Sequence, residues 1–148
     1  MTVDYIVSSL PALSFDAPAP LSWERFIAAC GGTPPDAAGW TDLETQLRNA
    51  MAEARGGEKY RRPADGCSVY WKNRVLACFQ ERDPLRRETL LDRTWWDAAG
   101  EMTDVAAPLG RGALLTYAIR LKIALKRSKI STDAGNAAFD RLTAETKR

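Results

Sequence analysis

The chain has 148 residues, of which 45% are hydrophobic and 27% are charged, and its formal net charge is +2. This length suits a single domain with its own core, and so small a net charge does not by itself indicate nucleic acid. The chain contains no histidine, which excludes a Ser-His or Cys-His nucleophile pair and imidazole ligation of a metal. We therefore expect a protein that is not an enzyme and that needs no cofactor.

The absence of targeting signals, together with the cysteine spacing, indicates the cellular compartment. No stretch approaches the ~18 uninterrupted apolar residues of a membrane-spanning helix, and the N-terminus lacks the basic and apolar regions of a secretory signal. The three cysteines are odd in number and show no CxxC spacing, so neither a disulfide framework nor a zinc site is indicated. These patterns predict a cytoplasmic protein with buried free thiols at Cys30, Cys67 and Cys78.

The first part of the chain, residues 1–38, is predicted to be a mostly extended, proline-rich segment that contains one short helix. Residues 3–8 favour extended structure, and four prolines from Pro11 to Pro34 disfavour long helices. The short helix should begin after Ser22, whose side chain can cap its first turn, and end at the glycine pair that follows Cys30.

The remainder, residues 41–147, is predicted to form a helical bundle. A first helix should begin at Thr41, which forms a capping box with Glu44, and should end at Gly56. After a polar loop, a second helix is expected over about residues 67–82. The apolar stripes of these two helices carry Leu43, Leu47, Ala50, Met51 and Ala54 in the first, and Trp71, Val75, Cys78 and Phe79 in the second.

Asp83 and Pro84 then predict the start of a third bundle helix, because aspartate is a good N-cap and proline fits the first helical position. Its apolar stripe contains Leu91, Trp95, Ala98, Ala99 and Met102. Two carboxylate pairs at helical spacing lie off this stripe, and we interpret both as solvated. They are Glu88 with Asp92 and Asp97 with Glu101.

The longest helix is predicted over residues 112–130. Its two adjacent apolar rows form a wide band, which indicates a helix in the centre of the bundle. The rows are Leu114, Ala118, Leu121 and Leu125, and Leu115, Ile119 and Ile123. A separate final helix, starting near residues 131–133, should bury Ala138, Phe139 and Leu142. The predicted fold is therefore an all-α, compact bundle of five or six helices in one domain, residues 1–148.

The long helix also carries the sharpest charge feature, because residues 111–130 contain basic residues and no acid. They are Arg111, Arg120, Lys122, Lys126, Arg127 and Lys129. This pattern is compatible with a solvated face, with a docking surface for an acidic protein, or with an anionic membrane surface. Nucleic acid is less favoured, because Tyr117 is the single aromatic residue nearby for stacking on bases.

Trp96 is the second candidate, because it lies about 100° round the helix from Trp95 and both cannot point into one core. Either Trp96 packs against a second helix layer or it is an exposed anchor. A docking role predicts that Trp96 and the basic residues are exposed on one side. The candidate partner-binding residues are Trp96, Arg120, Lys122, Lys126, Arg127 and Lys129.

Three segments together resemble a bacterial family of proteins whose genes accompany those of V-type ATP synthases. Residues 5–13, YIVSSLPAL, resemble the opening of its members. Residues 83–104, DPLRRETLLDRTWWDAAGEMTD, are similar to a helix of that family, and residues 117–142, YAIRLKIALKRSKISTDAGNAAFDRL, are similar to its closing pattern. The family often has an aromatic residue where this chain has Ser128.

That family is similar in character to the C subunit of V-type ATPases, an all-helical protein that joins the central rotor stalk to the membrane ring. The resemblance implies a non-catalytic component, either an accessory protein or one that resembles the C subunit, whose partners are stalk or rotor subunits. It also implies a location in the cytoplasm, at most peripheral to the inner membrane through the complex. The alternative is a general helical adaptor or a nucleic-acid-binding protein that uses the basic face of residues 111–130.

Overall fold

The computed structural model describes the backbone of residues 2–146 and the side chains of residues 2–130 except residue 58. The described backbone contains helices and no strands, which confirms the all-α bundle. The α-helices are α1 (Val3–Ser9), α2 (Trp23–Ala29), α3 (Ala38–Ala54), α4 (Val69–Cys78), α5 (Pro84–Ala99) and α6 (Arg111–Thr146). Two short 3₁₀ helices are η1 (Glu58–Tyr60) and η2 (Gly100–Met102). Within this part of the chain, no helix is both long enough and apolar enough to cross a membrane.

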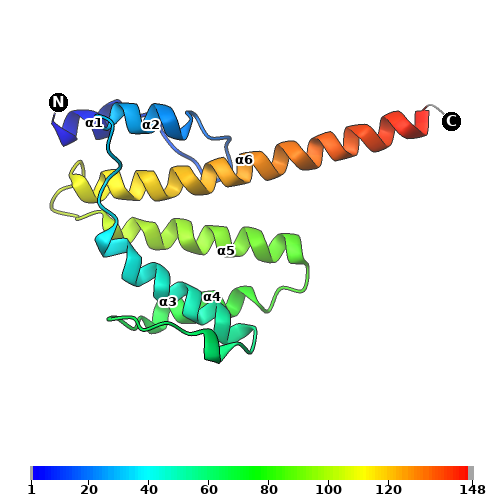
Figure 1. Cartoon of the computed structure of the whole chain (residues 1–148), viewed down its shortest axis with the longest axis horizontal. Helices are drawn as coiled ribbons and strands as arrows, with labels where there is room; N and C mark the ends of the chain where they lie inside the picture. Colours follow the sequence, from blue (N-terminus) through cyan, green and yellow to red (C-terminus); the bar gives the residue numbers. More distant parts are fainter. Residues whose placement is uncertain (1, 147–148) are drawn as a thin grey trace.

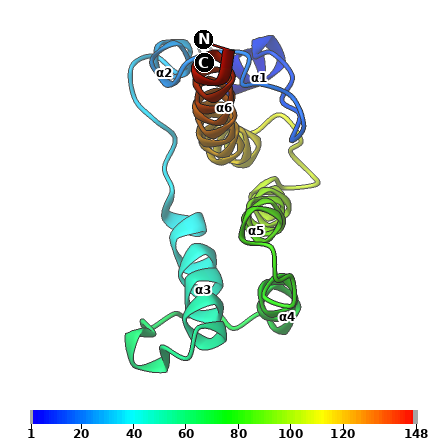
Figure 2. The ribbon, with the colours of Figure 1, turned by 90° about the vertical axis from the view of Figure 1, so that its right-hand side faces the viewer.

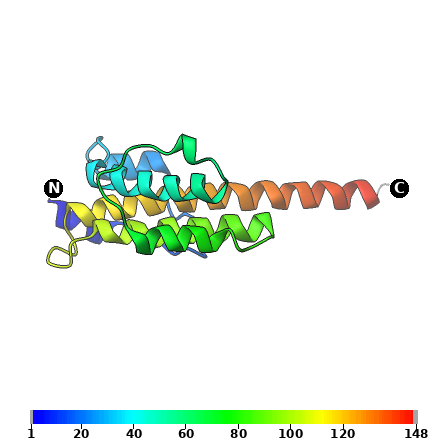
Figure 3. The same ribbon diagram turned by 90° about the horizontal axis from the view of Figure 1, so that it is seen from below.

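The long helix α6 organises the molecule (Figure 1). Seen end-on, α1 and α2 lie on either side of it, α5 lies beneath it, and α3 and α4 lie farther away (Figure 2). The first half of α6 runs alongside these helices, whereas its second half projects past them (Figure 3). The bundle is therefore built around one half of a single helix.

The two apolar rows predicted on this helix contact two different hydrophobic clusters. Leu114, Ala118 and Leu121 pack with Ile6 of α1 and Phe26 of α2, and both Phe26 and Leu121 are fully buried. The other row, which begins at residue 115, belongs to a cluster that also contains buried residues of α3, α4 and α5. The predicted central position of this helix is thus confirmed.

The prediction that residues 3–8 are extended is wrong, because they form helix α1. The Thr2 side chain caps it by accepting a hydrogen bond from the Tyr5 amide at 3.4 Å. Ile6 is buried against α6. Tertiary burial therefore overrides the weak β-preference of this segment. The N-terminal segment contains two short helices, where the sequence predicted one.

The predicted capping box at Thr41 is also wrong, because α3 begins earlier, at Ala38. The Thr41 hydroxyl donates to the Ala37 carbonyl oxygen at 3.1 Å, and Glu44 accepts a hydrogen bond from the Trp40 indole at 2.9 Å. Trp40 is 6% exposed, because a helix that begins before it places its side chain in the core. The Asp83–Pro84 start of α5 is confirmed, since the Asp83 carboxylate accepts from the Leu85 amide at 3.2 Å.

Two further boundaries and one cysteine prediction differ from expectation. Helix α4 spans ten residues and is shorter than predicted, with Ser68 as its cap. Helix α6 continues through residues 131–133, which contain no glycine or proline that would end a helix. The predicted burial of Ala138, Phe139 and Leu142 falls outside the described side chains. The prediction of a buried thiol holds for Cys78, whereas Cys30 is half-buried and Cys67 is exposed.

Candidate binding groove

The predicted single basic face on α6 is wrong, because the candidate residues lie on two sides of the helix. Arg120 and Arg127 are seven residues apart, so at about 100° per residue they point in nearly the same direction. Lys122 points about 160° away from Arg120. Arg120 and Arg127 are half-buried, whereas Lys122 and Lys129 are exposed.

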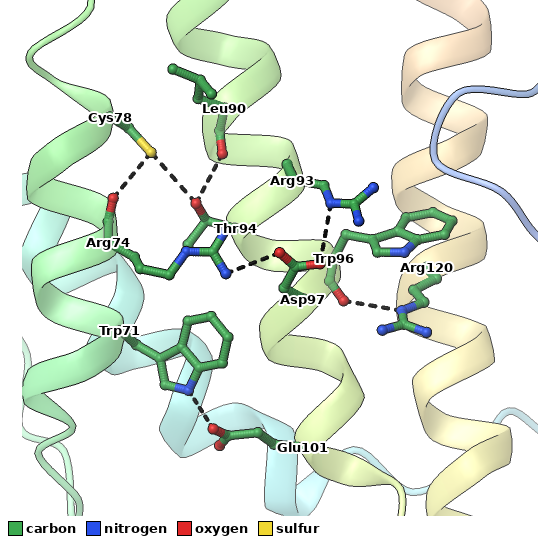
Figure 4. Close-up of polar contacts among 10 residues, drawn as sticks. All are labelled: Trp71, Arg74, Cys78, Leu90, Arg93, Thr94, Trp96, Asp97, Glu101 and Arg120. Atoms are coloured by element: carbon green, nitrogen blue, oxygen red, sulfur yellow. Dashed lines mark hydrogen bonds and ion pairs between the residues drawn. The ribbon is translucent and has the colours of Figure 1, made fainter.

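Arg120 is held against Trp96 on α5 (Figure 4). Its Nε donates to the Trp96 carbonyl oxygen at 3.0 Å, and its guanidinium lies 5.3 Å from the centroid of the Trp96 ring. Trp96 is only 6% exposed and meets the Phe15 ring edge-on at a centroid distance of 5.6 Å. Trp96 therefore packs against a second layer, and its interpretation as an exposed anchor is wrong. Burial lowers the pKa of Arg120, partly offset by the charge of Asp97.

Arg127 has a similar structural role beside Phe15. Its guanidinium lies 4.0 Å from the centroid of the Phe15 ring, and that of Arg93 lies 5.2 Å from the same centroid.

Tyr117 of α6 also contacts the segment between α1 and α2. The Tyr117 hydroxyl donates to the Pro11 carbonyl oxygen at 2.6 Å, and burial raises the pKa of Tyr117 to about 12. This side of α6 thus anchors the proline-rich segment between α1 and α2 onto the bundle.

Lys126 joins α6 to α5 through two carboxylates. Its Nζ lies 2.7 Å from Glu88 and 2.8 Å from Asp92. Asp92 is buried, so the interpretation of this carboxylate pair as solvated is wrong for Asp92. Burial lowers the pKa of Lys126, but the hydrogen bonds to Asp92 and Glu88 outweigh that effect and leave the pKa raised.

On the Lys122 side, α6 borders an open groove of about 620 Å³. The chain between α2 and α3 crosses from the α6 side of the bundle to its far side (Figure 2). The groove has an aromatic and apolar lining from six segments of the chain: α2, the α2–α3 connection, α3, η1, α5 and α6. Its lining includes Trp23, Pro34, Pro35, Trp40, Tyr60, Trp95, Leu115, Ile119 and Ile123.

The charged residues of this groove are mostly basic: Arg48, Arg62 and Lys122 face one acid, Glu44. Glu44 is already engaged, because one oxygen lies 3.0 Å from Arg48 and the other accepts from the Trp40 indole. The Lys122 ammonium lies 4.7 Å from the centroid of the Trp23 ring. Among the described side chains, neither Lys122 nor Arg62 has an acidic partner, so the groove carries uncompensated positive charge.

The rim that carries Arg62 is fixed to α3 by a set of side-chain clamps. Asn49 donates to the Arg62 carbonyl oxygen at 2.7 Å and accepts from the Arg62 amide at 2.8 Å. Asp42 accepts from the amides of Asp65 and Gly66 at 2.6 and 3.0 Å. The hydrogen bond from the Asp65 amide is the main cause that lowers the pKa of Asp42. The loop after η1 is therefore held in place by Asp42 and Asn49, which lie two turns apart on α3.

A second depression of about 470 Å³ adjoins the groove, since both are lined by Glu44, Arg48, Trp95, Lys122 and Ile123. It runs along α6 toward Lys126, where Glu88 and Asp92 exceed the lysine charge by one. The concave surface is thus basic and aromatic at one end and weakly acidic at the other.

Lys122 was among the predicted candidates, but its spacing on the helix did not associate it with this groove. Trp95, predicted on an apolar stripe, packs against the core but is only partly buried and also lines the groove, as does Trp23. Since the lining comes from segments far apart in the sequence, no local pattern could have signalled it.

Comparison with known proteins finds no family model that matches the chain, and no curated protein or solved structure with significant similarity to it. The resemblance described above therefore stays a prediction.

Proposed function

We propose that the protein is a non-catalytic component of a bacterial V-type ATP synthase, either an accessory protein or one that resembles the C subunit. It acts by docking onto stalk or rotor subunits in the cytoplasm, and reaches the inner membrane only through that complex. The proposal starts from the resemblance of residues 5–13, 83–104 and 117–142 to the synthase-associated family. The observation that carries it is the projecting second half of α6.

Helix α6 has 36 residues. At a rise of about 1.5 Å per residue it is roughly 54 Å long, and the part after residue 130 extends beyond the other helices (Figures 1 and 3). Ile130, the last residue of α6 with a described side chain, is 43% exposed although it is apolar. Isolated helices shorter than about 12–15 residues are marginal in water, and the part of α6 after residue 130 is only slightly longer than this, so a partner that packs along it would stabilise it. These features support a helix that docks onto another protein.

The test is affinity purification of the tagged full-length chain from bacterial membranes that contain an intact V-type synthase. We expect stalk or rotor subunits to be recovered with it. A variant that stops after Ile130 should lose them while it keeps the helical circular dichroism and cooperative unfolding of the bundle. Recovery of the full chain without any synthase subunit, from membranes in which the synthase is active, would overturn the proposal.

The geometry gives less support to the alternative, a nucleic-acid-binding protein or general adaptor that uses the basic face of residues 111–130. Arg120 and Arg127 lie over aromatic rings, and Lys126 is paired with two carboxylates. Arg111, Lys122 and Lys129 remain as exposed cations. They point in nearly the same direction, but the helical rise separates them by about 16 and 10 Å along α6, which leaves few phosphate contacts. A salt-dependent mobility shift of labelled DNA or RNA would restore this alternative.

A further inference from the structure

The groove bounded by α2, the α2–α3 connection, α3 and α6 suggests the chemistry of one partner. We propose that it binds a short acidic segment of another protein, which inserts an apolar side chain among Trp23, Trp40 and Trp95 and places its carboxylates at Lys122 and Arg62. This inference deepens the proposed function in that it rests on protein binding, but it does not require that the partner belong to the synthase.

The lining of the groove supports an apolar anchor. Its volume of about 620 Å³ lies within the ~300–1,000 Å³ that is usual for ligand sites in proteins. Trp23 and Trp95 are partly buried and leave aromatic surface at the groove, while Tyr60 at the rim is 70% exposed. Partly exposed aromatic surface in a concave site gains free energy when an apolar side chain covers it.

The charges of the groove select an acidic partner. Glu44 is neutralised by Arg48, which leaves Lys122 and Arg62 without carboxylates among the described side chains. A partner with opposite charge would be attracted to these cations, whereas a basic segment would be repelled. The Lys122 ammonium is already positioned at the groove by its contact with the face of the Trp23 ring.

The groove is also formed in advance of binding. Asn49 fixes the backbone of Arg62 by two hydrogen bonds, and Pro34 and Pro35 restrict the opposite wall. The connection reaches that wall through a turn in which Gly31 and Gly32 have φ values of +84° and +94°, a conformation that favours glycine. A preformed site loses little conformational entropy when it is occupied.

The shape of the site favours a polypeptide segment over a compact small molecule. The groove adjoins the second depression, and the two together follow α6 from Leu115 to Lys126. These eleven steps along the helix correspond to about 16 Å, which an extended peptide of roughly five residues spans. The apolar pocket at one end and the open track beyond it match an anchor side chain followed by a short stretch of chain.

The test uses the isolated full-length protein and its own tryptophan fluorescence, since Trp23, Trp40 and Trp95 line the site. The probe is a synthetic peptide, Glu-Asp-Phe-Leu-Glu-Asp with blocked termini. One control peptide carries lysine at each acidic position, and another carries serine at the two apolar positions. We expect a saturable fluorescence change with the acidic, apolar peptide, and binding at least about tenfold weaker for each control, equivalent to 1.4 kcal/mol.

A matched pair of variants locates the binding. Lys122→Glu should weaken binding of the acidic peptide about tenfold or more, whereas Arg82→Glu makes the same charge change at an exposed site outside the groove and should change it less than twofold. Both should unfold at the wild-type midpoint. Absence of a saturable signal up to about 1 mM peptide, equal binding of either control peptide, or equal effects of the two variants would overturn the inference.

This outcome is separable from that of the membrane purification. If synthase subunits are recovered but the peptide fails to bind, the groove inference is wrong and the proposed function stands. If the peptide binds with the expected selectivity but no synthase subunit is recovered, the groove inference stands and the proposed function is wrong.

Discussion

The two sides of α6 carry the same kind of charge but use it differently. On one side, Arg120 and Arg127 lie against aromatic rings and Arg120 donates to a backbone oxygen of α5. On the other side, Lys122 faces an open groove. A planar guanidinium can stack on a ring and donate laterally at the same time, so arginine suits the closed side. A count of basic residues on a helix therefore does not define a docking surface.

The largest effect should come from removing the ring beneath Arg120. Because Trp96 is 6% exposed, Trp96→Ala should lower the free energy of unfolding by about 3–5 kcal/mol, measured by urea denaturation followed by circular dichroism. If the alanine variant does not fold, Trp96→Phe provides a milder cavity for the same measurement. A loss below about 0.5 kcal/mol would mean that Trp96 behaves as a surface residue and that this side is not closed.

The second prediction compares how much the two sides of α6 contribute to the free energy of unfolding. Arg120→Ala removes the hydrogen bond to the Trp96 carbonyl and the contact with its ring, and should cost about 1–3 kcal/mol of unfolding free energy. Lys122→Ala, on the groove side, should stay within about 0.5 kcal/mol of wild type. Thermal and urea unfolding of both variants checks this, and equal losses would remove the distinction between the sides.

Lys126 lies between these two sides, and its raised pKa predicts a dependence on alkaline pH. Stabilisation by its pairing with Glu88 and Asp92 is fully present below its ordinary pKa of 10.5 and is lost as the pH rises through the higher folded-state pKa. Unfolding free energy measured from neutral pH to above 10.5 should therefore fall less steeply in Lys126→Met. The raised pKa of Tyr117 adds a loss of the same sign, so Tyr117→Phe in the Lys126→Met background serves as the control. Unchanged pH dependence in Lys126→Met would show that the pairing does not stabilise the folded state.

The smallest global effect is expected at the rim of the groove. The lowered pKa of Asp42 means that its contribution is present above the ordinary value of 3.8 and is lost as the pH falls through the lower folded-state pKa. Asp42→Asn should therefore make the stability of the loop less dependent on acidic pH. It should also speed hydrogen exchange at the Asp65 and Gly66 amides. Unaltered exchange at both amides would show that Asp42 does not fix the rim.

Several features of the fold were predictable because they depend on local chemistry. The Asp83–Pro84 start of α5 needs only a capping carboxylate and a proline at the first turn. The two rows on α6 follow from the helical repeat and indicated its central position. The same repeat also places Arg120 and Lys122 on opposite sides, so the division of the basic residues was readable from their spacing.

Other features depended on neighbours that a local pattern does not contain. Helix α1 forms where Ile6 can be buried on α6, and α3 begins early enough to bury Trp40. Trp96 had two open interpretations, and the Phe15 segment, far away in the chain, decided between them by covering its ring.

The sequence by itself determined that the chain is helical, where most helices lie, and that one long helix is central, because capping and helical periodicity act within a few residues. The tertiary structure alone decided which directions round that helix are covered and which are open. The groove exists because segments around Trp23, Trp40, Arg62 and Lys122 meet without filling the space between them. Packing between distant segments sets that space, and residue spacing along one helix carries no information about it.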